Sequence, residues 1–201
     1  MNAPHWLETT KDVVNILAIP ATLILAWMGF GAWRREHRGK SRYEVARHLL
    51  KSAIAYKDIL NDTRNPMMHS YESSDRKHNP EESPDENQRQ DELFATAKRL
   101  EKVNEARREF YLNRLDAEVL WPDRIPGLCD PLMRSHNELV VNFRTYYTLT
   151  KKTKRTADND ALLERAQAVI WAGGDEDRFK AKVDATLKAL DDFLRPHIML
   201  R

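Results

Sequence analysis

The sequence predicts an all-α protein: one N-terminal transmembrane helix followed by a cytoplasmic helical bundle of about five helices. Three observations lead to this fold class. Residues 13–33 contain no charged side chain, whereas the rest of the chain is rich in charges of both signs. Beyond residue 42, apolar residues recur every three or four positions, which is the period of an amphipathic helix. Only six of the 201 residues are glycine, and clusters of β-branched residues are scarce, which disfavours a sheet protein.

The apolar run at residues 13–33 has the length of a membrane-spanning helix. Its 21 residues extend about 31 Å at the helical rise, which matches the hydrocarbon core of a bilayer. A cleaved signal peptide is disfavoured, because Glu8 and Asp12 precede the run and Arg34 follows it where a small-residue cleavage site would lie. We therefore expect a retained single-pass anchor.

The charges that flank the run predict its orientation. Residues 34–42 hold five basic residues and one acid, whereas residues 1–12 hold one lysine and two acids. By the positive-inside rule, we expect the tail at 1–12 to lie outside and the domain at 43–201 to lie in the cytoplasm. The flanking cations set this topology, and contact with anionic lipid headgroups is a second possible role for them. They are Arg34, Arg35, Arg38, Lys40 and Arg42.

Small residues share one face of the predicted anchor. Side chains of this kind at a spacing of about four let two transmembrane helices approach closely, so this face is a candidate for self-association. The residues are Ala18, Thr22, Ala26 and Gly29.

Periodicity and capping signals place five helices in the cytoplasmic domain. They are expected over residues 43–64, 88–121, 130–150, 159–171 and 175–195. The second is long enough to run the height of a bundle or to pair as a coiled coil. Its expected contact seam is Leu93, Ala97, Leu100, Asn104, Arg107, Tyr111, Arg114 and Glu118.

The segment at residues 67–90 differs in composition from the helices around it. Eight acids and three basic residues lie between Glu72 and Glu92, with two prolines among them. Burying the few apolar groups of this segment cannot offset the conformational entropy that would be lost on ordering it. We therefore expect an exposed, flexible acidic loop.

No catalytic motif or cofactor-binding motif occurs in the sequence. There is no phosphate-binding glycine loop and no zinc-binding spacing of histidine and cysteine, so neither a cofactor nor a metal is expected. Cys129 is expected in a proline-rich loop, where the adjacent helix start would lower the pKa of a reactive thiol; an inert loop cysteine is the favoured alternative. A carboxylate–histidine metal site inside the bundle has as its only candidates Glu44, His48, Glu118 and His136.

Charged residues beside the apolar stripes are expected to pair across helices and fix their register. An anion or peptide groove lined by the arginines is the functional alternative. The residues of this expected network are Asp58, Asp62, Arg64, Arg107 and Arg114.

The stretch at residues 39–66, GKSRYEVARHLLKSAIAYKDILNDTRNP, follows an anchor and a basic segment. In that context it resembles a group of uncharacterised bacterial single-pass inner-membrane proteins with a YEVAR-LL opening and a closing RNP. The resemblance covers about the first third of the chain. It implies a location in a bacterial inner membrane, and it implies no activity.

These features favour a membrane-anchored interaction protein whose bundle binds partner proteins or self-assembles. The expected partners are the lipid bilayer and a protein or a second copy. Nucleic acid is not expected, because the net charge of +2 leaves no broad basic excess. The alternatives are a ligand- or metal-binding sensor or enzyme within the bundle, and a membrane-acting toxin or defence effector.

Overall fold

The computed structural model describes residues 40–151, 156–173 and 176–199. The predicted anchor at 13–33 lies outside these residues. So do the packing face of Ala18, Thr22, Ala26 and Gly29 and the basic residues Arg34, Arg35 and Arg38. The chain divides into two units, Met1–Glu44 and Val45–Arg201. Of the predicted basic residues, Lys40 and Arg42 are described; they belong to the first unit and are exposed.

The described part of the chain is all α-helical, as the sequence predicts. It contains a helix over residues 40–63, the 3-10 turn η1 (Ser70–Glu72), α2 (Pro84–Leu120), α3 (Ile125–Thr150), α4 (Ala157–Ile170) and α5 (Arg178–Ile198), without a strand. Within these same residues, no helix combines the length and the apolar character that a membrane span needs.

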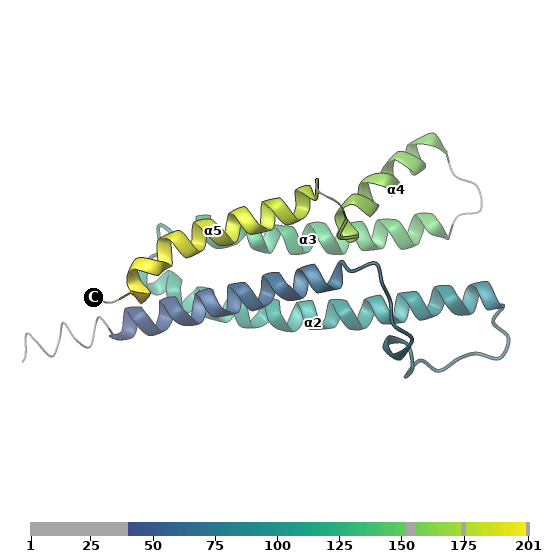
Figure 1. Ribbon diagram of the computed structural model, residues 1–201, viewed down its shortest axis with the longest axis horizontal. Coiled ribbons are helices and arrows are strands. Elements are labelled where there is room, and N and C mark those ends of the chain that lie inside the picture. The colour runs from purple at the N-terminus through teal and green to yellow at the C-terminus, as the bar shows by residue number, and fades with distance from the viewer. Residues whose placement is uncertain (1–39, 152–155, 174–175, 200–201) are drawn as a thin grey trace, which may run out of the picture. The chain divides into compact units, whose positions relative to one another are not determined.

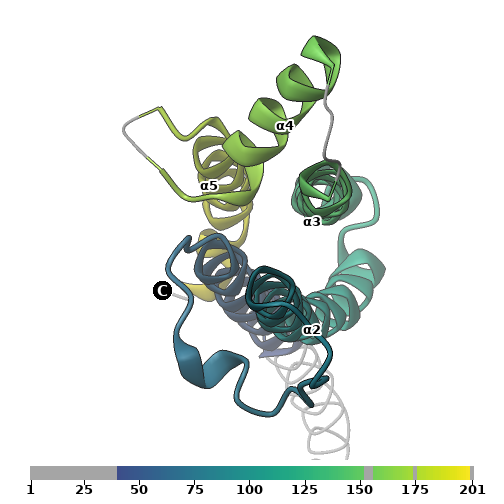
Figure 2. The same ribbon diagram turned by 90° about the vertical axis from the view of Figure 1, so that its right-hand side faces the viewer.

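The core lies between the helix over 45–63, α2, α3 and α5 (Figures 1 and 2). The helix over 45–63 runs beside the C-terminal half of α2 and ends near the middle of that helix (Figure 1). Tyr56 stacks on Phe110 of α2 with ring centroids 5.6 Å apart, and both side chains are fully buried. From α5, Val183, Leu190 and Leu194 complete this core.

Helix α3 begins five residues before the expected N-terminus at Asp130. The dipeptide Asp130-Pro131 looks like a cap followed by proline in the first turn, but Pro131 lies inside the helix. Ile125 and Cys129 are fully buried, so core packing favours the extra turn and outweighs the hydrogen bond that a proline nitrogen cannot donate. Pro126 occupies the first turn instead, where a missing N–H costs nothing.

Two other helix ends differ from expectation. α2 begins at Pro84 and not near residue 88, because Ser83 caps the helix by accepting a hydrogen bond from the Glu86 amide at 3.3 Å. α5 continues through Pro196 to Ile198, although proline was expected to end it. In the last turn Pro196 breaks only one internal bond, and the Met199 amide still donates to the Arg195 carbonyl at 2.9 Å.

The segment between residues 64 and 83 is tied to α2 by two arginines. Arg99 of α2 binds the Glu72 carboxylate at 2.5 Å and donates to the backbone carbonyls of Asn65 and Met67, each at 2.6 Å. Arg76 pairs with Glu82 and with Asp91 of α2. The acidic composition therefore serves defined ion pairs here, which the composition alone did not predict.

Arg64 joins the end of the first described helix to the connection between α4 and α5. Its side chain is fully buried and donates to the carbonyl of Val169 at 2.7 Å, the carbonyl of Trp171 at 3.2 Å and the carboxylate of Asp177 at 2.8 Å. The guanidinium also lies 4.5 Å from the centroid of the Phe179 ring. Arg64 thereby satisfies carbonyls at the C-terminal end of α4, where a cation is favoured by the helix dipole.

Asp177, the partner of Arg64, also caps α5. Its carboxylate accepts the Lys180 amide at 2.9 Å. Burial alone would raise the pKa of Asp177, but the hydrogen bonds from Arg64 and Lys180 hold it below its ordinary value. One ion pair therefore fixes three helices relative to one another.

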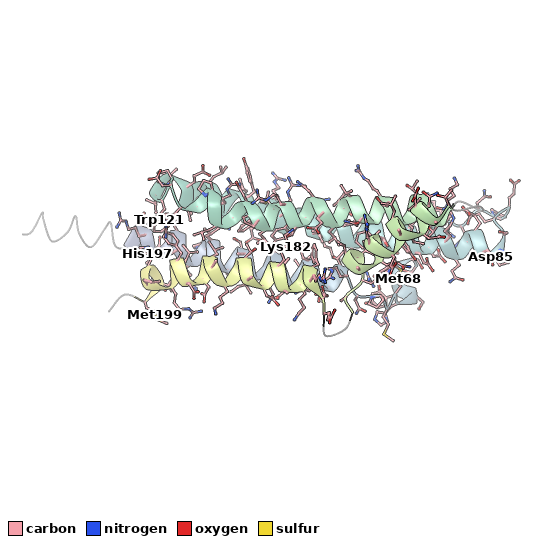
Figure 3. All side chains as sticks on the ribbon, turned by 90° about the horizontal axis from the view of Figure 1, so that it is seen from above. Met68, Asp85, Trp121, Lys182, His197 and Met199 are labelled. Atoms are coloured by element: carbon pink, nitrogen blue, oxygen red, sulfur yellow. The ribbon has the colours of Figure 1, made fainter. Side chains whose placement is uncertain are left out.

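Aromatic side chains pack together at the end of the unit where α2 and α5 terminate. Trp121 follows α2 and packs on His197 of α5, with ring centroids 4.8 Å apart (Figure 3). Asp85, in the first turn of α2, lies at the opposite end in the same view. The 37 residues of α2 separate the two ends by roughly 55 Å.

Candidate functional site: a groove between α2 and α3

An open groove with a volume of about 970 Å³ lies between the N-terminal half of α2 and the C-terminal half of α3. The helix over 45–63 ends near the middle of α2 (Figure 1) and leaves the N-terminal half of α2 without this neighbour. We call this feature the α2–α3 groove. Its lining is Arg89, Leu93, Thr96, Ala97, Leu100, Asn104 and Arg107 of α2, with His136, Asn137, Val140, Val141, Phe143, Arg144, Tyr147 and Thr148 of α3 and the adjoining Lys151.

Five of the eight α2 residues that the sequence placed in a helix–helix contact line this groove. Leu93, Ala97, Leu100, Asn104 and Arg107 all face it, and each is exposed or only partly buried. The buried residues of α2 lie on another side of the helix, mostly one position before a seam residue in the sequence and so about 100° around the helix from it. They are Ala95, Thr96, Val103, Ala106, Phe110 and Ala117. The expected helix–helix contact is therefore wrong along this stretch, because within the described residues no segment covers these side chains.

Tyr147 and Thr96 hold the two walls of the groove together. Their hydroxyl groups lie 2.7 Å apart and share a hydrogen bond between α3 and α2. Behind them, Phe143 stacks on Tyr147 and meets Trp171 edge-on at 6.0 Å. This aromatic packing makes the α3 wall a rigid surface rather than a deformable one.

The charges on the lining are all positive. Arg89, Arg107, Arg144 and Lys151 contribute four cations, and no aspartate or glutamate lines the groove. Arg89 is held by Glu86 through two hydrogen bonds, and these lower the pKa of the Glu86 carboxyl to about 2. Arg107 and Arg144 form no ion pair with any residue that the structure describes.

A buried polar pair lies beneath the groove. His136 is 3% exposed and Tyr56 is fully buried, and their rings are 6.4 Å apart. Neither the Tyr56 hydroxyl nor His136 Nδ1 has a hydrogen-bond partner among the described residues. Burial, together with the smaller effect of the positive charge of Arg107, lowers the pKa of His136 to about 4. His136 is therefore neutral at physiological pH.

This shift predicts a loss of stability in mildly acidic solution. The unfolded chain protonates His136 near its ordinary pKa of 6.5, whereas the folded protein resists protonation until about pH 4. Stability is therefore full above pH 6.5 and falls as the pH drops through this window, by on the order of 2–3 kcal/mol. Urea denaturation of the full chain in detergent, followed by circular dichroism across this range, measures the effect. His136→Leu should remove it, and equal pH profiles for the two proteins would contradict the assignment.

The unpartnered hydroxyl of Tyr56 gives a second expectation. A buried polar group without a hydrogen bond costs about 1–3 kcal/mol, so Tyr56→Phe should raise the free energy of unfolding by about 1 kcal/mol. Tyr147→Phe is the matched control, because it removes a hydroxyl that bonds to Thr96 and should lower stability by about 1 kcal/mol. Urea denaturation compares them, and a clear loss of stability in Tyr56→Phe would show that its hydroxyl has a partner.

The residues of the expected ion-pair network lie in separate places. Arg64 pairs with Asp177 of the α4–α5 connection and not with α2. Arg114 bridges α2 to Asp130 of α3 at 2.9 Å. Asp58 contacts Lys57 of its own helix, and Asp62 is exposed. Arg107 faces the groove, so the arginine-lined groove, which sequence analysis held as an alternative, describes its position better than a helix–helix ion pair.

The four candidate metal ligands do not form a site in the described residues, where no group of three or more His, Cys, Asp or Glu side chains could hold a metal ion. Glu44 and His48 are exposed, and Glu118 pairs with Arg114 at 3.6 Å. His136 is buried beside Tyr56, and burial favours its neutral form.

Cys129 is not the loop cysteine that the sequence suggested. It lies on α3, is fully buried, and burial raises the pKa of its thiol to about 12. A thiol so far from ionisation is not a nucleophile at neutral pH.

Sequence reasoning did not select Arg144 or Val140 and Val141 as members of a site. The sequence nevertheless held a signal for two of them. Val140 belongs to the apolar stripe of α3, and Arg144 lies four residues later on the same face. The separation of α2 from α3 along this stretch, which makes a surface of these residues, has no local sequence signature. Comparison of the chain with models of protein families, with curated proteins and with solved structures finds no match.

Proposed function

We propose that the protein is a membrane-anchored, non-enzymatic binding module whose helical bundle docks a partner protein through the α2–α3 groove. The observation that carries this proposal is an apolar helix face, at regular helical spacing, that the described chain leaves uncovered. Leu93, Ala97 and Leu100 of α2 and Val140 of α3 line the groove, and Val141 at its edge is 58% exposed. A contiguous exposed apolar patch with a polar rim is typical of a protein-interaction site.

The rest of the bundle supports a rigid platform rather than a reactive centre. The buried titratable groups, Tyr56, Cys129 and His136, are each held in the neutral form by burial. The ionised buried pair, Arg64 with Asp177, is committed to joining helices. A nucleophile beside a base, or two carboxylates facing a shared cavity, would be needed for the common hydrolytic reactions.

The membrane location rests on the run at 13–33 and on the basic segment at 34–42. Fractionation tests it: the full chain should stay with the membrane through an alkaline wash, and deleting residues 13–33 should release it to the soluble fraction. A full chain that is already soluble would refute the anchor.

Co-purification tests the docking function. The tagged full chain is extracted from its own membranes in mild detergent and compared with Ala97→Trp, which fills the groove from an exposed position, and with Ala185→Trp, an exposed position on α5 away from it. We expect one protein partner at a fixed ratio with the wild type and with Ala185→Trp, and its loss with Ala97→Trp. A partner retained equally by all three proteins would place docking elsewhere, and no partner at all would contradict the proposal.

A further inference from the structure

We infer that the occupant of the α2–α3 groove is an amphipathic helix with acidic flanks, supplied by a partner protein. The inference rests on the proposed docking function and adds the chemistry of the partner to it. Two observations carry it: the length of the groove and the sign of its charges.

The length fits a helix. On α2 the lining runs from Arg89 to Arg107, and on α3 from His136 to Lys151. At the helical rise these stretches are about 27 Å and about 22 Å long, which corresponds to a helix of roughly 15–18 residues. The groove is open along its side, so a small molecule would remain largely in water, whereas small-molecule sites usually enclose most of their ligand. A helix laid between two helices buries its apolar face in such a trough.

The charge selects acidic flanks. The lining has four cations and no carboxylate. Arg89 is already paired with Glu86, whereas Arg107 and Arg144 lack ion-pair partners among the residues that the structure describes. Elsewhere the arginines of the bundle meet carboxylates readily: Arg64, Arg76, Arg99 and Arg195 all do so. Glutamate or aspartate side chains on both edges of an occupant would supply the missing partners through charge-assisted hydrogen bonds.

The apolar floor separates this site from a nucleic-acid channel. Leu93, Leu100 and Val140 offer no hydrogen bonds to a phosphate backbone, and the ring of Phe143 is buried rather than presented for base stacking.

The chain itself offers a poorer occupant. Its exposed apolar stripe on α2 comprises Leu112, Leu115 and Val119. Arg108 lies one turn before this stripe and Asp116 lies within it, so its flanks carry mixed charge and do not complement four cations. A second copy is therefore an outcome that the test must be able to reveal.

The test uses the full chain in phosphatidylcholine nanodiscs and a fluorescent peptide of about 18 residues, the length set by the groove. The peptide carries leucine every three or four positions and glutamate on both flanks; a matched peptide carries lysine in place of glutamate. Fluorescence anisotropy measures binding. We expect saturable binding of the glutamate peptide, loss of that binding with Ala97→Trp, and little binding of the lysine peptide.

Charge reversal on the rim tests the same point from the side of the protein. Arg144→Glu/Lys151→Glu changes two exposed groove residues, and Arg134→Glu/Arg165→Glu makes the same change in net charge at exposed positions outside it. We expect the dissociation constant for the glutamate peptide to rise about tenfold or more with the first pair and to stay within about twofold with the second. Because all four side chains are exposed, folding should be preserved, and circular dichroism checks this.

The outcomes separate this inference from the docking function. Equal binding of both peptides, with sensitivity to Ala97→Trp, would keep the groove as a docking site and overturn the acidic occupant. Displacement of the peptide by phosphatidylglycerol vesicles but not by phosphatidylcholine vesicles would assign the cations to lipid, and release of the peptide by unlabelled full chain would assign the groove to a second copy; both overturn the inference. Failure of the glutamate peptide to bind also overturns it, while co-purification of a partner decides the docking function separately.

Discussion

Replacing Arg64 with alanine is expected to lower the free energy of unfolding by about 3–5 kcal/mol, which would leave little net stability in a bundle of this size. The side chain is fully buried, and its removal leaves the Asp177 carboxylate, 8% exposed, without its cation. The carbonyls of Val169 and Trp171 also lose their donor. Breaking one side of a buried pair is costly because the charge that remains cannot reach water.

Urea denaturation of the full chain in detergent measures this effect, with two matched variants as controls. Arg165→Ala removes an exposed arginine of α4 and should change stability by less than about 0.5 kcal/mol. Arg64→Lys keeps the charge but cannot donate in a planar fork, so its loss should lie between the other two. If Arg64→Ala were as stable as Arg165→Ala, the pair with Asp177 would not be what holds α4 and α5 to the first described helix.

Replacing Phe110 with alanine is expected to cost about 3–5 kcal/mol through the cavity that it leaves. Phe110 is fully buried and stacks on Tyr56, at the point where α2 meets the helix over 45–63. This contact anchors the C-terminal half of α2. The N-terminal half of the same helix forms one wall of the groove.

Leu115→Ala is the matched control for Phe110→Ala, since Leu115 lies on the same helix and is 41% exposed. It should cost less than about 1 kcal/mol, because little apolar surface returns to water. Thermal unfolding followed by circular dichroism compares the two variants. Similar melting temperatures for both would mean that the Tyr56–Phe110 contact does not belong to the cooperative core.

The helical class of the protein could be predicted from the sequence because the helical period is a local signal. Leu49, Tyr56 and Leu60 of the first described helix, and Val183, Leu190 and Leu194 of α5, recur at helical spacing and are buried in the structure. Helix ends were harder to predict wherever tertiary packing overrode a local rule. Pro131 was expected at the start of a helix, but burial of Ile125 and Cys129 extends α3 beyond it.

The surroundings of the buried arginine and of the groove-lining arginines could not be predicted for a different reason. Arg64 and Asp177 lie 113 positions apart, and no periodicity relates them. Arg107 belongs to a seam with helical spacing, and this spacing would be the same whether another part of the chain or a partner covered the seam. A sequence pattern identifies the residues of such a face, whereas the neighbour of that face is set by tertiary packing.

Hydrogen–deuterium exchange of the full chain, measured alone and with the partner that we expect to co-purify, tests most directly whether a partner docks in the α2–α3 groove. We predict slower amide exchange in residues 89–107 of α2 and 136–151 of α3 when the partner is bound, with no change at residues 112–119. Protection confined to residues 112–119, or no protection on either wall of the groove, would contradict this account.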